Sequence, residues 1–144
     1  MTSVYDSAEY IITEMNRREV EITHLKLQKL LYFSYIYHYK KNNVELFDEN
    51  FNAWAYGPVI EEIYKIYKKY RDLPIKLQRK NLNLSKMEKE SLNFVIETLG
   101  FKDPFDLVKI SHSKDAPWYR VFIENESQGG IISKNELIRY AITM

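Results

Sequence analysis

The sequence contains no cysteine, which excludes a disulfide framework, a thiolate nucleophile and a zinc site with cysteine ligands. It has no apolar run approaching the roughly 18 residues of a membrane span, and its first residues lack the basic start of a signal peptide. The 21 basic and 20 acidic residues nearly cancel, which argues against nucleic-acid binding through overall charge. We therefore expect a cytoplasmic protein with no membrane contact.

Glycine and proline are also scarce, with four of each, so long uninterrupted helices can form. At 144 residues the chain has the length of one domain, 1–144, and can build a core without disulfides or metal. Aromatic residues are abundant at 15 %, and tyrosine can either complete a core with its hydroxyl in water or contact a partner.

Apolar residues recur at helical spacing through most of the chain, and capping residues mark where helices begin. From Thr23 to about Asn42 the sequence is apolar nearly all round, as is typical of a buried central helix. Ser85 and Glu88 have the spacing of a capping box. Further helices are predicted over about 3–17, 58–71, 85–99 and 116–125, with a short one from 103 and a last one from 133.

A small β element is expected beside these helices. Residues 51–55 alternate weakly between apolar and polar and end at Gly57 and Pro58, which predicts one short strand. Pro58 suits the first position of the helix that follows. Residues 129–132 are a candidate for a second extended segment. The expected fold class is mainly α (α+β), a compact bundle of about six to seven helices around a buried central helix, with one or two short β-strands.

Three segments combine residue types that neither a generic helix nor a generic turn contains. They are Leu27, Gln28, Lys29, Leu30, Leu31, Tyr32 and Phe33; residues 46–49 followed by Ala53, Trp54, Ala55, Tyr56, Gly57, Pro58, Val59 and Ile60 and then by Ile63 and Tyr64; and Ser111, His112, Pro117 and Trp118. In this order and spacing they resemble the SocA-like antitoxin family, whose shared module is the Panacea domain. The resemblance covers about residues 4–142.

The resemblance implies a bacterial or phage antitoxin domain that binds a protein toxin encoded beside it. In this family some members mask the toxin directly, whereas others deliver it to the ClpXP protease as adaptors. We expect direct, stoichiometric neutralisation. The adaptor mode is the first alternative, and a nucleic-acid-binding regulator of phage or prophage origin is the second. Some relatives carry an N-terminal helix-turn-helix domain, which we do not expect here because the chain begins inside the module.

No set of residues has the pattern of a catalytic or metal site. Ser34 and His38 share one helix face, but no third acidic residue and no nucleophile-elbow motif accompanies them. His24 and His38 lie about 21 Å apart along one predicted helix and cannot share a metal ion. His112 lies in another segment. We therefore expect no enzyme activity, no cofactor and no metal.

The family-motif residues are expected to be mainly structural. Trp54 would fill a core slot, and Gly57 would let the strand turn tightly into the next helix. His112 would be a buried histidine with a hydrogen-bond partner. The alternative is that Tyr56 and its neighbours anchor the toxin, because aromatic anchors dominate protein interfaces.

Basic and aromatic residues alternate between Glu61 and Lys80, where bases outnumber acids. The apolar stripe expected to face the core is Val59, Ile60, Ile63, Tyr64, Ile66, Tyr67 and Tyr70. Because the aromatic rings fall on this stripe, stacking against nucleic-acid bases is not favoured. The charged side is a solvated helix face, a surface for an acidic protein partner or a surface for nucleic-acid phosphates. The candidate partner-binding residues are Lys65, Lys68, Lys69, Arg71 and Tyr56.

Overall fold

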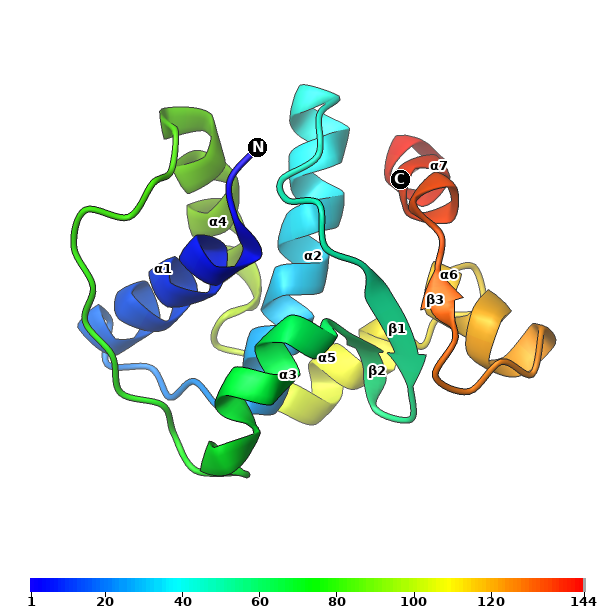
Figure 1. Ribbon diagram of the computed structural model, residues 1–144, viewed down its shortest axis with the longest axis horizontal. Helices are drawn as coiled ribbons and strands as arrows, with labels where there is room; N and C mark the ends of the chain where they lie inside the picture. Colours follow the sequence, from blue (N-terminus) through cyan, green and yellow to red (C-terminus); the bar gives the residue numbers. More distant parts are fainter. Residues whose placement is uncertain (144) are drawn as a thin grey trace.

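A computed structural model describes residues 1–143, and its fold is built around one central helix (Figure 1). This helix, α2 (His24–Asn42), contacts α1, α4, α5, α7 and strand β2. It begins where the Thr23 hydroxyl accepts a hydrogen bond from the backbone N–H of Lys26. It ends at Asn43, whose φ of 59° leaves the helical region. Both predicted ends of the central helix are confirmed.

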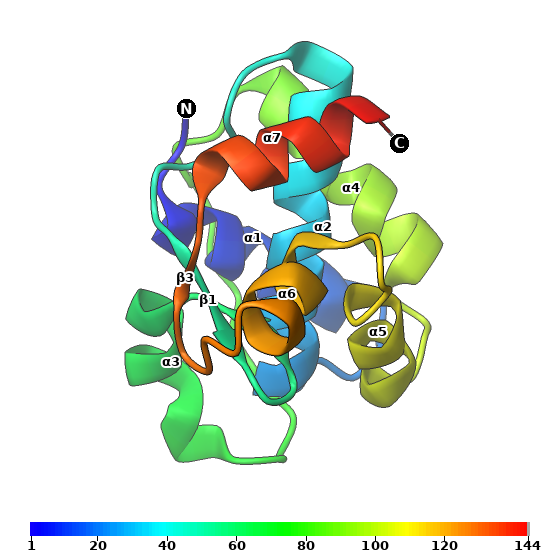
Figure 2. The same cartoon turned by 90° about the vertical axis from the view of Figure 1, so that its right-hand side faces the viewer.

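Six further α-helices surround α2 within residues 1–143, so the mainly α fold is confirmed. They are α1 (Val4–Arg17), α3 (Glu61–Tyr67), α4 (Lys86–Leu99), α5 (Pro104–Ser111), α6 (Pro117–Tyr119) and α7 (Lys134–Thr143). A 3-10 turn, Lys68–Tyr70, follows α3, and a π-helical turn, Arg120–Glu124, follows α6. Helices α1 and α4 lie on one side of α2, while α6 and α7 lie on the other (Figures 1 and 2). None of these helices is both long and apolar enough to span a bilayer.

A small antiparallel sheet of three strands packs beside α2. Its strands are β1 (Phe51–Trp54), β2 (Gly57–Val59) and β3 (Ile131–Ile132), in the order β2-β1-β3. The prediction that Pro58 starts a helix is wrong, because Pro58 pairs with Ala53 in β2 and α3 begins three residues later. Proline is tolerated there because β2 is an edge strand and needs no N–H on its outer side. The extended segment predicted over residues 129–132 is confirmed for its second half, which forms β3.

The core follows α2 along its length. The rings of Tyr32, Tyr35 and Phe51 meet edge to face, with centroids 5.4 and 5.9 Å apart, and all three side chains are fully buried. The capping box at the start of α4 is confirmed: the Ser85 hydroxyl accepts from the backbone N–H of Glu88, and the Glu88 carboxylate accepts from that of Ser85.

The stripe predicted to face the core on α3 is narrower than expected. Ile63 and Tyr67 are buried, but Tyr64 and Ile66 are exposed, which corrects the sequence prediction for both. The helix has only seven residues and lies at the surface, so one narrow face is covered. The Tyr64 ring lies edge-on to Trp54 instead, with centroids 4.8 Å apart.

Candidate functional site

The three family motifs, which lie far apart in the sequence, meet beside the N-terminal part of α2. The Gln28 side chain binds both backbone groups of Ile60: its oxygen accepts from the N–H at 2.9 Å and its nitrogen donates to the C=O at 3.2 Å. The indole N–H of Trp118 donates to the C=O of Trp54 at 2.7 Å. The first and third motifs therefore both bind the backbone of the second, Gln28 just after β2 and Trp118 at the end of β1.

Lys29, from the first motif, is fully buried beneath this hairpin. Its ammonium donates to the C=O of Pro58 at 3.0 Å, and no carboxylate within residues 1–143 pairs with it. Burial lowers the pKa of Lys29 to about 7. Gly57 makes room for it, since a Cβ there would lie 2.8 Å from Lys29 Cε and 2.7 Å from Ser111 Oγ. The glycine is required both for this approach and for its φ of 105°.

His112 and Trp118, from the third motif, stack face to face with ring centroids 3.6 Å apart. Burial and the nearby charge of Lys29 lower the pKa of His112. The expectation of a hydrogen-bond partner for His112 is not met, because its buried Nε2 has none within residues 1–143. His112 instead stacks on Trp118, whose ring also stacks with that of Phe122 at a centroid distance of 4.7 Å.

A shallow groove of about 280 Å³ lies between the start of α2, the hairpin turn and α3. Its lining residues are His24, Leu25, Gln28, Trp54, Ala55, Tyr56, Val59, Tyr64 and Arg71. Trp54 is half-buried in this wall rather than filling a core slot, which corrects the sequence prediction. Tyr56, on the hairpin turn, is 63 % exposed and meets the ring of Phe105 edge-on, so apolar surface continues from the groove onto α5.

The polar groups at the floor of the groove are already occupied. The Gln28 amide nitrogen lies 3.0 Å from His24 Nε2 and also donates to Ile60, so both of its hydrogens are used. This arrangement requires His24 Nε2 to be an acceptor, and therefore a neutral imidazole. Burial, together with the charge of Lys29, lowers the pKa of His24 to about 4, which keeps the ring neutral at pH 7.

The candidate basic residues are all exposed, but they do not form one cluster. Lys65 lies on α3, Lys68 and Lys69 lie in the 3-10 turn, and Arg71 follows it. Of these four, Arg71 lines the groove, as does the candidate Tyr56. The ammonium of Lys68 lies 5.7 Å from the centre of the Tyr64 ring at the groove edge. The structure therefore brings Arg71 and Tyr56 together and places the lysines beside them.

Several groove residues were not identified from the sequence. His24, Leu25 and Val59 were assigned no site role, and Tyr64 was expected in the core. One usable signal was present: His24 and Gln28 are four residues apart on one helix, so they share a face. The pairing of that face with the hairpin depends on contacts that are distant in sequence.

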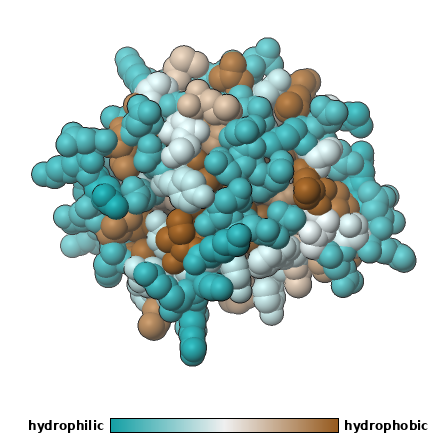
Figure 3. All heavy atoms as spheres, viewed as in Figure 1, coloured by the Kyte–Doolittle hydropathy of each residue, from teal (hydrophilic) through white to brown (hydrophobic). Residues whose placement is uncertain are grey.

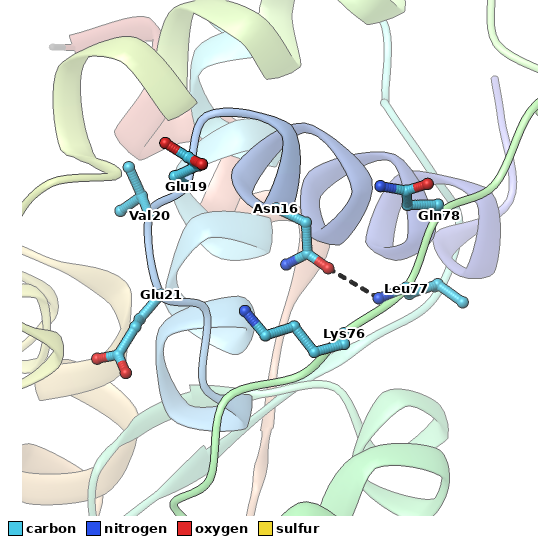
Figure 4. A pocket seen from close by; sticks show the side chains of 7 residues that line it. All are labelled: Asn16, Glu19, Val20, Glu21, Lys76, Leu77 and Gln78. Carbon is cyan, nitrogen blue, oxygen red and sulfur yellow. Dashed lines mark hydrogen bonds between the residues drawn. The ribbon is translucent and has the colours of Figure 1, made fainter.

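A larger hollow of about 670 Å³ lies at the end of α1 (Figure 4). Asn16 holds the extended segment there, donating to the C=O of Ile75 at 3.0 Å and accepting from the N–H of Leu77 at 2.8 Å. The carboxylates of Glu19 and Glu21 do not point toward each other (Figure 4). These two carboxylates therefore do not converge on one cation. Its lining residues are Asn16, Glu19, Val20, Glu21, Lys76, Leu77 and Gln78.

Ser34 and His38 do not contact each other through a hydrogen bond. His38 Nδ1 lies 2.7 Å from the hydroxyl of Ser91 on α4 and 3.0 Å from the amide of Asn42. The Ser34 hydroxyl is buried without a partner in the described part of the chain. Within residues 1–143, no three histidine, aspartate or glutamate side chains come together as metal ligands would.

Comparison with known proteins gives one match. A family model described as antitoxin SocA-like, Panacea domain, covers residues 27–119. The matched range begins at the first residue of the first motif and ends one residue after Trp118, so it contains all three motifs that meet at the hairpin. No curated protein and no solved structure matches the chain.

Proposed function

Because the chain belongs to the SocA-like antitoxin family with a Panacea domain, we propose that it neutralises a cognate protein toxin by direct, stoichiometric contact. The observation that carries this proposal is the family match over residues 27–119, which also confirms the resemblance seen in the sequence. In this interpretation the toxin is the partner, and occlusion of its active or substrate-binding surface is the mechanism.

The geometry supports a binding role. The motif contacts made by Gln28 and Lys29 fix the hairpin to the central helix, and the contact made by Trp118 fixes it to α6, without using its outer surface. That outer surface carries an exposed tyrosine and a groove and is flanked by basic side chains. A surface that is fixed in advance binds with a smaller loss of conformational entropy, which favours a stable complex.

We also propose that the protein acts by binding alone, not as an enzyme, and that it does so in the cytoplasm with its toxin. The absence of enzyme activity is supported by the hydrogen bonds of His38 and by the buried position of Lys29, since both groups are engaged inside the fold. The face in Figure 3 is largely hydrophilic, with hydrophobic residues in small separate spots.

The test is co-expression with the open reading frame next to the gene for this chain. That frame alone should arrest growth of a bacterial host, and adding the chain should restore growth and yield a one-to-one complex on co-purification. Rescue that persists in a host lacking ClpX supports direct masking. Rescue that disappears there, with the toxin accumulating, would replace masking by proteolytic delivery. Absence of rescue and of a complex in both hosts would refute an antitoxin role for this pair.

A further inference from the structure

We propose that the groove between α2, the hairpin turn and α3 is the docking site for an acidic segment of the toxin, in which an apolar side chain stands next to a carboxylate. The proposal rests on the toxin-binding function proposed above and specifies the chemistry of the segment that is bound. Arg71 would bind the carboxylate, and Trp54, Tyr56 and Tyr64 would contact the apolar side chain.

The size and lining of the groove suit a protein side chain. Its volume of about 280 Å³ lies just below the roughly 300–1,000 Å³ of pockets for free ligands. The rings of Trp54 and Tyr64, which meet edge to face, line the groove together with Leu25 of α2. Tyr56 is 63 % exposed and Phe105 is 57 % exposed, so this aromatic surface lacks cover within the described residues. Aromatic residues at the centre of a patch are the typical anchors of protein interfaces.

The charge at the groove favours a carboxylate. Arg71 is the only charged lining residue, because His24 is neutral at pH 7 and no acidic side chain lines the wall. Within residues 1–143 the Arg71 guanidinium has no ion pair and no hydrogen bond, whereas Arg17, Arg18 and Arg79 each pair with a glutamate. The guanidinium can bind a carboxylate through two parallel hydrogen bonds, and the apolar wall strengthens that contact by excluding water.

The backbone at Arg71 supports a role for its side chain. Its φ of 55° and ψ of −122° lie in a region that glycine adopts far more easily than arginine. The turn is fixed by its N–H, which donates to the C=O of Lys68 at 3.1 Å. A residue with a side chain held in such a conformation costs stability, and strain of this kind concentrates at binding sites.

A second copy of the chain is a less suitable occupant. Self-association around a two-fold axis would place the same patch on both sides of the interface. Arg71 and Lys68 of one copy would then face the same cations of the other, and like charges brought together oppose association. An acidic partner has no such conflict.

The groove can be tested with small probes that share one ring. Indole-3-acetate carries a carboxylate, indole-3-acetamide is neutral and tryptamine is a cation. In two-dimensional NMR the two tryptophan indole signals serve as reporters, since Trp54 lines the groove and Trp118 is buried behind the hairpin. Indole-3-acetate, at about millimolar affinity, should shift the Trp54 signal most and bind several-fold more tightly than tryptamine. Equal binding of the three probes, or no shift at Trp54, would overturn the proposal.

The decisive variant is Arg71→Gly, with Arg79→Gly as the matched control. Glycine relieves the φ strain at position 71, so this variant should melt at the same or a higher temperature. It should nevertheless lose the preference for indole-3-acetate and bind the co-purified toxin about tenfold more weakly or worse. Arg79 lies outside the groove and pairs with Glu9. Its replacement should therefore change neither the preference for indole-3-acetate nor the affinity for the toxin.

The outcomes separate this inference from the proposed function. If the wild-type chain does not bind or neutralise the toxin, the proposed function fails. If it does, and Arg71→Gly and Tyr64→Ala bind the toxin as tightly as wild type, the toxin docks elsewhere and the groove inference alone fails. If sedimentation shows a wild-type dimer that Tyr56→Ala dissociates, the groove belongs to a second copy and the inference also fails.

Discussion

Lys29 is a buried amine that donates to a carbonyl oxygen and pairs with no carboxylate within residues 1–143, and this makes the stability of the fold dependent on pH. Its pKa is lowered from 10.5 to about 7 by burial. Between these two values the unfolded chain therefore binds more protons at this lysine than the folded chain does. Stability rises with pH wherever the unfolded state binds more protons, so the cost of burying Lys29 decreases from about pH 7 toward 10.5.

We predict that Lys29→Met removes this dependence. The free energy of unfolding of wild type should rise by about 3 kcal/mol relative to the variant between pH 7 and 9.5, because the slope between the two pKa values approaches about 1.36 kcal/mol per pH unit. Burial also raises the pKa of Tyr32 and Tyr35, but their effect is common to both proteins and cancels. Urea unfolding at several pH values measures the difference. If the free energies of unfolding of wild type and Lys29→Met change equally with pH, Lys29 remains an ammonium in the folded protein throughout this range, which would contradict the prediction.

Gly57 and Gly129 form a natural pair for separating backbone strain from steric contact. Both have positive φ, 105° and 87°, but a Cβ at Gly129 would meet nothing within 4 Å. Gly129→Ala should therefore cost only the conformational strain, about 1–2 kcal/mol. Gly57→Ala should cost about 1–3 kcal/mol more, because its Cβ would press on Ser111 and Lys29. Thermal or urea unfolding of the two variants decides this, and equal losses would mean that the contact relaxes freely.

Among the helices, α2 was the one best predicted from sequence, because its signals are local. Thr23 marks its start, and the nearly continuous apolar run marks it as buried. We predict that Leu31→Ala, in the middle of this run and fully buried, costs about 2–5 kcal/mol. Val44→Ala, just beyond the helix and half exposed, should cost far less. Chemical unfolding of both variants is the measurement, and a loss below about 1 kcal/mol for Leu31→Ala would contradict a tightly packed helix.

The β1–β2 hairpin shows why other elements were not predicted. Gly57-Pro58 resembles a helix start locally, yet β2 forms there because it pairs with β1 and is fixed by Lys29 and by Gln28 through Ile60. These partners lie about thirty residues earlier in the chain, beyond the reach of local rules. The motif residues could be selected by family resemblance, whereas the groove could not, since its lining combines three elements that only the folded chain brings together.

At the scale of the whole molecule, a net charge of +1 conceals an uneven distribution. Lys65, Lys68 and Lys69 stand exposed on α3 and the turn after it, beside the groove rather than in it. The charges of these lysines attract an acidic partner while it is still approaching. Arg71, in the groove, contacts the partner only once the complex forms. The two kinds of residue should therefore differ in which rate constant of toxin binding they affect.

We predict that the double charge reversal Lys68→Glu with Lys69→Glu slows association with the toxin more than it speeds dissociation. Charges at the rim steer the encounter and remain hydrated in the complex, so their replacement changes the approach more than the final contacts. The effect should shrink as the Debye length falls from about 10 Å at 0.1 M salt to about 3 Å at 1 M.

Arg71→Gly should show the opposite pattern, with faster dissociation that persists at high salt, because a desolvated ion pair is screened much less. Surface-plasmon kinetics at two ionic strengths, with melting curves for both variants, resolve the two effects. Unchanged association of the double reversal at low salt, with the fold intact, would show that Lys68 and Lys69 do not steer the toxin toward this side of the molecule.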